Sequence, residues 1–210
     1  MGDPKRMDHS DHTIKLYSPQ APVVIDTLMR DGVCFSRREF VEKKYGESAK
    51  IFLAAYDWFV KEAKNYTACP DGAEYPYWAF KDLDSVDSSA GAVPLILEVP
   101  VEAAVFFDVY DWNKILNLQY IGTSEADEKR LREMLSDYGI RNRSDIILTG
   151  FYPDLKRQVQ DSWARLFRHH EAIRSGDYSG VRKVQAALWQ IRRSWICPPV
   201  SSPDAKIFRL

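Results

Sequence analysis

The spacing of apolar residues along the chain predicts a mixture of strands and helices. Residues 14–17 alternate between apolar and polar side chains, as a half-buried strand does, and Pro19 is expected to end this strand. A short helix is expected over residues 23–30, with Pro22 at its start and Gly32 just past its end. The chain therefore opens with a strand, a turn and a short helix.

The same reasoning predicts the elements that follow. We expect helices over residues 48–65, 111–118, 124–138 and 154–170, and strands over residues 75–80, 95–99 and 105–109. Asp111 and Ser124 are suited to cap two of these helices, because short polar side chains satisfy the free N–H groups of a first turn. Pro76 indicates an edge strand or the start of a strand, since proline donates no hydrogen bond to a sheet.

Residues 181–196 fit two templates. The apolar residues from Val181 to Trp195 recur at helical spacing, while residues 185–191 also alternate as a strand does, so both structures stay open. A terminal strand is expected over residues 206–210. Residues 1–12 are charged and polar, and a disordered tail is predicted for them.

These elements predict one α+β domain over residues 13–210. A small, mostly antiparallel and split sheet is expected, flanked by amphipathic helices that bury one face each.

The charge is distributed unevenly along the chain. Residues 1–140 contain 16 Lys and Arg against 24 Asp and Glu, a balance of −8, whereas residues 141–210 contain 13 against 6, a balance of +7. A basic final third suits a nucleic acid or another acidic partner. It equally suits the acidic part of the same chain, and we expect this internal pairing to dominate.

Several classes of protein are disfavoured. Three widely spaced cysteines argue against a disulfide framework or a structural zinc site and suit a reducing cytoplasm. No apolar run approaches the roughly 18 residues that span a bilayer, so no membrane association is expected. The chain contains no G-x-G-x-x-G, G-x-x-x-x-G-K-[ST], H-E-x-x-H or G-x-S-x-G motif, and no metal site is predicted.

Acidic residues near the apolar strands are the first candidates for chemistry. Asp108 and Asp111 follow such a strand, where carboxylates bind ribose hydroxyls, orient a base or cap a helix. Glu98 lies between Leu97 and Val99, where it either lines a cleft or faces solvent. Asp57 lies within an apolar helical stretch and is expected to pair with an arginine, for which the basic final third is a source.

Aromatic and basic residues complete the candidate site. Tyr75, Tyr77, Trp78 and Trp112 have planar rings that either stack on a ligand or pack in the core. Arg37 is suited to phosphate, although a solvated surface position explains it as well.

The elements AYDW, YPxWA and DxxDW together resemble an uncharacterised bacterial family known as a domain of unknown function. The resemblance extends from Ile14 to Ile196, nearly the whole chain, and it implies no activity. Relatives of this kind are richer in Asp at the strand end, whereas this chain keeps only Asp108 and Asp111 in FFDVYDW.

A weaker resemblance, at the level of the fold, is to ADP-ribosyltransferase-like domains. The opening stretch IKLYSPQAPVVIDTLMRDGV and the later LILEVPVEAAVFF carry it. The resemblance implies a split sheet with a cleft for NAD, in which Lys15 or Tyr17 contributes from the first strand and residues 75–78 cover the nicotinamide. It further implies an acid that steadies the ribose, for which Glu98 and Asp108 are the candidates.

The sequence thus supports three hypotheses of function. The first is an ADP-ribosyltransferase-like domain that binds NAD or a nucleotide in an aromatic-lined cleft. The second is a protein-interaction module without catalysis. The third is a nucleic-acid binder that uses the basic residues Arg157, Arg165, Arg168, Arg182, Lys183, Arg192 and Arg193.

Overall fold

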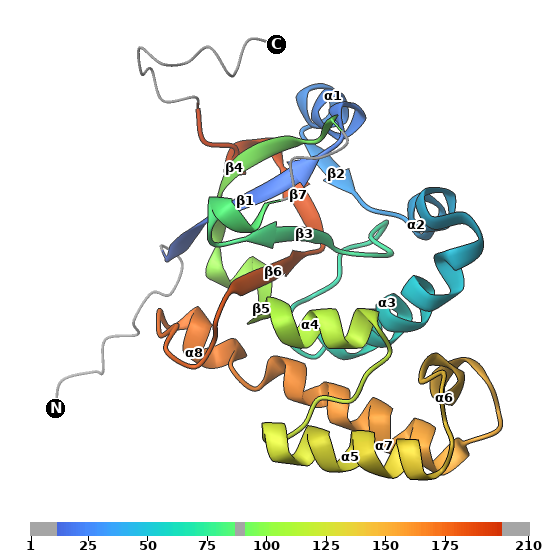
Figure 1. Cartoon of the computed structure of the whole chain (residues 1–210). Coiled ribbons are helices and arrows are strands. Elements are labelled where there is room, and N and C mark those ends of the chain that lie inside the picture. The colour runs from blue at the N-terminus through green and yellow to red at the C-terminus, as the bar shows by residue number, and fades with distance from the viewer. Residues whose placement is uncertain (1–11, 87–90, 199–210) are drawn as a thin grey trace, which may run out of the picture.

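The computed structural model describes residues 12–86 and 91–198 (Figure 1). The tail predicted for residues 1–12 lies outside these ranges except for His12, and so does the strand predicted over residues 206–210.

A five-stranded sheet forms the centre of the domain. Its strands are β1 (Thr13–Gln20), β3 (Tyr77–Phe80), β4 (Val93–Pro100), β5 (Ala104–Asp108) and β6 (Val184–Leu188). They lie in the order β4-β1-β3-β6-β5, and each neighbouring pair is antiparallel. Two further strands, β2 (Val33–Phe35) and β7 (Gln190–Arg192), form a separate antiparallel sheet. The predicted α+β domain with a split antiparallel sheet is confirmed.

The five-stranded sheet curls strongly. Strands β4 and β5 are its two outer strands, yet only the 3₁₀ turn Val101–Ala103 separates them along the chain. Strands about 4.8 Å apart would put the outer strands of a flat sheet about 19 Å apart. The four residue steps from Pro100 to Ala104 span at most about 14 Å. The end of β4 and the start of β5 are therefore drawn together, which a flat sheet does not allow.

Helices cover the sheet and extend beyond it. They are α1 (Pro22–Asp31), α2 (Arg38–Tyr45), α3 (Ala49–Ala63), α4 (Val109–Leu116), α5 (Glu125–Asp137), α6 (Ser144–Leu148), α7 (Pro153–Trp163) and α8 (His170–Arg174). Figure 1 shows α5, α6 and α7 grouped at the end of the molecule farthest from β4. Proline begins α1 and Gly32 ends it with a φ of 78°, as its sequence predicts.

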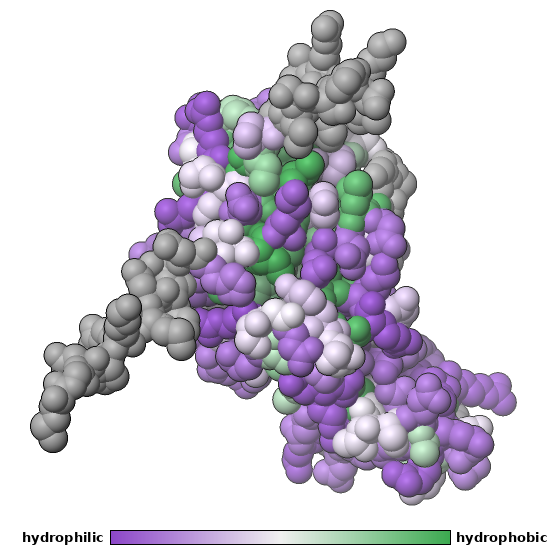
Figure 2. Space-filling view, turned by 90° about the vertical axis from the view of Figure 1, so that its left-hand side faces the viewer, coloured by the Kyte–Doolittle hydropathy of each residue, from purple (hydrophilic) through white to green (hydrophobic). Residues whose placement is uncertain are grey.

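The core has one part on each face of the sheet. Phe107 and Trp78 pack on the side of α3, α4 and α7, whereas Phe106 and Tyr77 pack on the opposite side with Leu16. Adjacent residues of a strand point to opposite faces, so both faces of β5 are apolar because both are covered. Figure 2, which views the molecule from the left-hand side of Figure 1, shows apolar residues between hydrophilic ones on that face.

Some predicted elements are wrong in detail. Strand β1 continues through Pro19 to Gln20, and β3 lies in the middle of the sheet, not at its edge. Pro76 directly precedes Tyr77, the first residue of β3, so the strand start that it indicates is confirmed and its missing N–H costs the sheet nothing.

The structure also decides the secondary structure of two further segments, residues 181–196, which fit both helix and strand, and residues 154–170, which were predicted as one helix. Residues 184–188 are a strand because β3 and β5 pair with them on both sides, and residues 190–192 are a strand because β2 pairs with them. The helix predicted over residues 154–170 ends at Trp163, continues as a 3₁₀ turn over Ala164–Phe167 and is followed by the separate α8.

Candidate functional site

The AYDW and YPxWA elements hydrogen-bond to each other. The Tyr75 hydroxyl donates to Asp57 Oδ1 at 2.6 Å, and Trp78 Nε1 donates to the Tyr56 hydroxyl at 3.0 Å. Arg38 Nη1 donates to Asp57 Oδ1 at 2.7 Å and to the Tyr75 hydroxyl at 2.9 Å. The expected partner of Asp57 is therefore wrong, since the arginine comes from α2 and not from the basic final third. Burial, reinforced by the bond to Asp57, raises the pKa of Tyr75, so this hydroxyl stays protonated.

The remaining aromatic candidates lie inside the protein. Trp78 packs on Trp112 with ring centroids 4.8 Å apart, and Trp112 is 2% exposed. Tyr77 faces the opposite side of the sheet, where its hydroxyl lies 2.9 Å from Cys34 Sγ. Tyr75, Tyr77 and Trp112 are all buried, and Trp78 is half-buried. The structure thus places these rings in two parts of the core and not along one surface.

Asp108, and not Asp111, caps the helix that follows β5. Its Oδ1 accepts the Tyr110 N–H and its Oδ2 accepts the Arg182 N–H, both at 2.7 Å. The predicted cap at Asp111 is wrong because α4 begins earlier, at Val109. Both oxygens of Asp108 thus have backbone partners, and the residue is 7% exposed.

Asp111 lies inside α4 and joins it to its neighbours. Asp111 is 3% exposed, and its carboxylate accepts a hydrogen bond from Arg168 Nη2 at 2.7 Å. Lys114 Nζ lies 3.4 Å from the same carboxylate and 2.6 Å from Glu128 of α5. The DxxDW element therefore provides a helix cap, a buried carboxylate that pairs with an exposed arginine, and a core tryptophan.

Three candidates lie together on the solvent face of β1 and β4. Lys15 is opposite Glu98, and Tyr17 is opposite Ile96 on β4 and Phe80 on β3. Lys15 and Glu98 are exposed, whereas Tyr17 is half-buried. Residues at positions i and i+2 of a strand share one face, so the three side chains are neighbours despite their separation in the sequence.

Arg37 lies elsewhere. It directly precedes α2, which lies across the domain from β4 (Figure 1), and its guanidinium lies 3.7 Å from Glu39. The structure does not bring Arg37 to Lys15, Tyr17 and Glu98.

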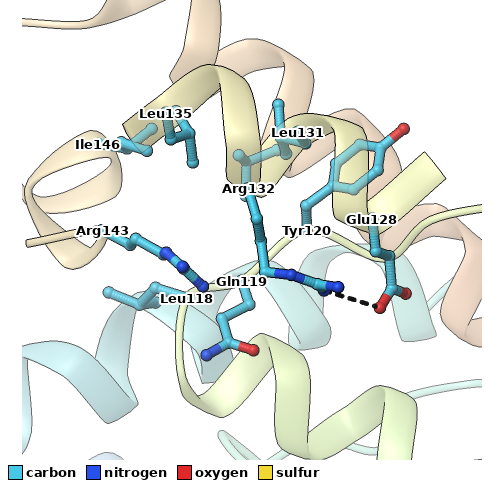
Figure 3. Close-up of a pocket in the computed structure, with 10 residues that line it drawn as sticks. Leu118, Gln119, Tyr120, Glu128, Leu131, Arg132, Leu135, Arg143 and Ile146 are labelled. Atoms are coloured by element: carbon cyan, nitrogen blue, oxygen red, sulfur yellow. Dashed lines mark ion pairs between the residues drawn. The ribbon is translucent and has the colours of Figure 1, made fainter. Parts of the chain in front are cut away.

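A cavity between the helices was not predicted from the sequence (Figure 3). It is lined by residues of the α4–α5 loop, α5, α6 and α7, including Arg132 and Arg143. These two arginines belong to different elements, and no motif links them, so only the tertiary structure reveals that they share a cavity. Among the described residues, no group of three His, Cys, Asp or Glu side chains is arranged to hold a metal ion.

The fold and these contacts define an α+β domain in which the AYDW, YPxWA and DxxDW elements hold the core together. The chain belongs to the family described as "Domain of unknown function (DUF3841)", whose model matches residues 15–197. The predicted resemblance to an uncharacterised family is confirmed. No curated protein and no solved structure matches the chain, so these comparisons lend no support to the likeness to ADP-ribosyltransferase-like domains.

None of the helices in the described ranges combines the length and apolarity that crossing a membrane requires.

Proposed function

We propose that the protein binds NAD or a related nucleotide across the solvent face of β1 and β4. The observation that carries this proposal is the strand register, which sets Lys15 beside Glu98 and Tyr17 beside Ile96. An ammonium group suits a phosphate, a carboxylate accepts from ribose hydroxyls, and a half-buried tyrosine offers a ring to a base or to nicotinamide.

Within this proposal, Glu98 is the acid that contacts the ribose. Its carboxylate is exposed, whereas both oxygens of Asp108 accept backbone N–H groups. If the resemblance to ADP-ribosyltransferase-like domains extends to chemistry, Glu98 is also the residue that stabilises the positive charge that develops on the ribose when the nicotinamide bond breaks. Tyr75, Tyr77, Asp111 and Trp112 have partners inside the protein, so the proposal does not rest on them.

A calorimetric titration with NAD tests the binding. Replacing Lys15 by Gln should weaken NAD binding about tenfold or more, because a charge-assisted bond to phosphate is lost. Lys50→Gln is the control, since Lys50 is an exposed lysine at the start of α3. No binding of NAD by the natural sequence, or equal affinity in the two variants, would contradict the proposal.

Catalysis is tested separately by following the release of nicotinamide. Glu98→Gln should retain binding and lose release, whereas the exposed Glu47→Gln should change neither. Binding without release in the natural sequence would make the domain a nucleotide-binding module and not an enzyme.

The basic final third offers less support for a nucleic-acid function. Arg168 pairs with Asp111, Lys183 Nζ lies 2.7 Å from Asp84 Oδ2, and Arg165 Nη1 donates to the backbone oxygen of Ile121. These cations therefore already neutralise or bond groups of the same chain. Failure of NAD to bind would bring the protein-interaction hypothesis forward.

We also propose a cytoplasmic location in a bacterial cell. Cys34, Cys69 and Cys197 are free thiols, which suits a reducing compartment. Fractionation of the source cells tests this proposal. Detection of the protein outside the cytosolic fraction would contradict it.

A further inference from the structure

A cavity of about 60 Å³ opens between the α4–α5 loop, α5, α6 and α7 (Figure 3). One water needs roughly 10–15 Å³ on the same measure, so the cavity holds a molecule of several heavy atoms. Sites for drug-sized ligands measure about 300–1,000 Å³, so no dinucleotide fits here. This cavity is therefore distinct from the proposed NAD surface in size and in place.

Much of the cavity wall is apolar. The aliphatic side chains that line it are Leu118, Leu131, Leu135, Ile146 and Val159, each at most 8% exposed. They come from the α4–α5 loop and from three helices, so the wall exists only in the folded domain. A wall of this kind favours a ligand with an aliphatic part.

Two arginines and an amide form the polar side of the cavity. In Figure 3, the side chain of Arg132 descends from α5 and that of Arg143 reaches in from the residue before α6, with the Gln119 amide below them. Within the described part of the chain, Arg143 forms no ion pair or side-chain hydrogen bond.

Glu128 also lines the cavity, but its charge is already neutralised. Its Oε1 accepts from Lys114 Nζ at 2.6 Å and from the Gly122 N–H at 3.0 Å, while Arg132 lies 3.8 Å from its Oε2. Burial alone would raise the pKa of Glu128, yet these partners outweigh burial and lower it, so the carboxylate is ionised.

The charges around the cavity leave a positive excess. Arg168, Asp111, Lys114, Glu128 and Arg132 form a series of alternating sign that begins and ends with a cation. Of the charged residues that line the cavity, Arg132 and Arg143 are cations, and Glu128, which also pairs with Lys114, is an anion. An anion in the cavity would restore the balance.

The backbone beside the cavity is strained. Leu118 has a φ of 54°, in the left-handed region where glycine or asparagine usually ends a helix. Its N–H donates to the Ile115 oxygen and the Gln119 N–H donates to the Lys114 oxygen, which completes the end of α4. Glycine would remove the strain but also the 2% exposed leucine side chain that lines the cavity.

We propose that this cavity binds a small organic carboxylate, with its head on Arg132 and Arg143 and its short aliphatic chain against the leucine, isoleucine and valine side chains. A guanidinium group matches a carboxylate in geometry and charge. The apolar wall distinguishes this ligand from inorganic phosphate, which has no aliphatic part to bury.

The proposal is tested by methyl NMR of the full chain, titrated with butanoate. We expect saturable shifts confined to the methyl groups of the cavity wall. Butan-1-ol, which lacks the charge, and inorganic phosphate, which lacks the chain, should each bind at least about tenfold more weakly. A weak but specific site has a Kd of about 1 mM, and about 50 mM butanoate would saturate it. Absence of saturable shifts up to that concentration would overturn the proposal. Phosphate or butanol binding as tightly as butanoate would do the same.

Matched variants locate the binding. Arg143→Gln should weaken butanoate at least about tenfold, whereas Arg157→Gln, which removes a 74% exposed arginine of the adjacent α7, should leave it unchanged. Both arginines are exposed, so both variants are expected to fold, and their methyl spectra without ligand report it. Equal affinity in the two variants would overturn the assignment of Arg143.

Discussion

Single polar residues of the AYDW and YPxWA elements hold separate segments of the chain together. The hydroxyl of Tyr75 connects Asp57 of α3 with Arg38 of α2, and the ring nitrogen of Trp78 bonds to the Tyr56 hydroxyl. A buried polar group without a partner is costly, so each of these bonds constrains which residues the position accepts. The AYDW and YPxWA elements of this chain are therefore explained, in these positions, by stability.

Tyr75→Phe should lower the free energy of unfolding by about 1–2 kcal/mol. The substitution keeps the ring but leaves Asp57 and Arg38 without the buried hydroxyl that bonds to both. Urea denaturation measures the loss. Tyr138→Phe is the control, because Tyr138 is 69% exposed and should change stability by less than about 0.5 kcal/mol. Equal effects of the two substitutions would show that the Tyr75 hydroxyl is not structural.

Sequence reasoning predicted the kind of contact that a residue makes more reliably than it predicted which residue takes part in that contact. It predicted an ion pair for Asp57, and the pair exists, but with Arg38. It predicted a helix cap after β5, and the cap exists, but at Asp108. The Asp57 side chain is 52% exposed, so burial does not require its pair, and the choice of partner depends on which segments the fold brings within reach.

Elements with a strong period were the most predictable. The stripe of apolar residues in α3 and the capping Ser124 of α5, whose side chain accepts the Asp127 N–H, lie where the sequence predicts them. Residues 184–192 fit both periods, and only their pairing with β2, β3 and β5 decides for strands. The helical period at residues 154–170 likewise does not reveal the change to a 3₁₀ turn after Trp163.

The cap at Asp108 should matter more than the cap at Ser124. Asp108→Ala leaves two N–H groups without partners, those of Tyr110 and Arg182, and should cost about 2–4 kcal/mol. Ser124→Ala removes one bond to an exposed helix end and should cost about 1 kcal/mol. Urea denaturation of the two variants provides the comparison. A smaller cost at Asp108 than at Ser124 would contradict a structural role for this carboxylate.

At the scale of the whole molecule, the helices complete the edge of the sheet. Strand β5 is an outer strand, and the Phe106 N–H donates to Nδ1 of His170 on α8 at 3.0 Å. His170 is 1% exposed, and burial lowers its pKa. Glu171, 3.7 Å from Nε2, opposes this shift, whereas Arg174 adds to it. A neutral imidazole thus takes the place of a neighbouring strand.

Stability should therefore fall as the pH is lowered through about 6.5. The unfolded chain binds a proton at His170 near that pH, whereas the folded chain binds it only at lower pH. Between the two pKa values the unfolded state holds more protons, so acidification favours it, and the loss is complete below the folded pKa. Urea denaturation between pH 7.5 and 5.5 measures the effect.

His170→Gln is the matched variant, because its amide oxygen still accepts a hydrogen bond but does not titrate. It should lose less stability than the natural sequence over the same pH range, because His9, His12 and His169 are present in both proteins and only His170 differs. An NMR titration of the His170 imidazole gives an independent check. Equal pH dependence of the two chains, or an imidazole pKa at or above about 6.5, would contradict the role of His170.

The sequence by itself determined the fold class, the opening strand and helix, the bounds of α3 and α5 to within two residues, and membership of the family, whereas it did not predict α2 or α6. These features follow from the local spacing of apolar residues and from prolines, glycines and capping residues. Each of these acts on residues that are close in the sequence. The tertiary structure alone decided the curl of the sheet, the partners of Asp57 and Asp111, and the meeting of Lys15, Tyr17 and Glu98 on one face. It also created the cavity of Arg132 and Arg143. Each of these depends on segments distant in sequence, whose contacts no local period encodes.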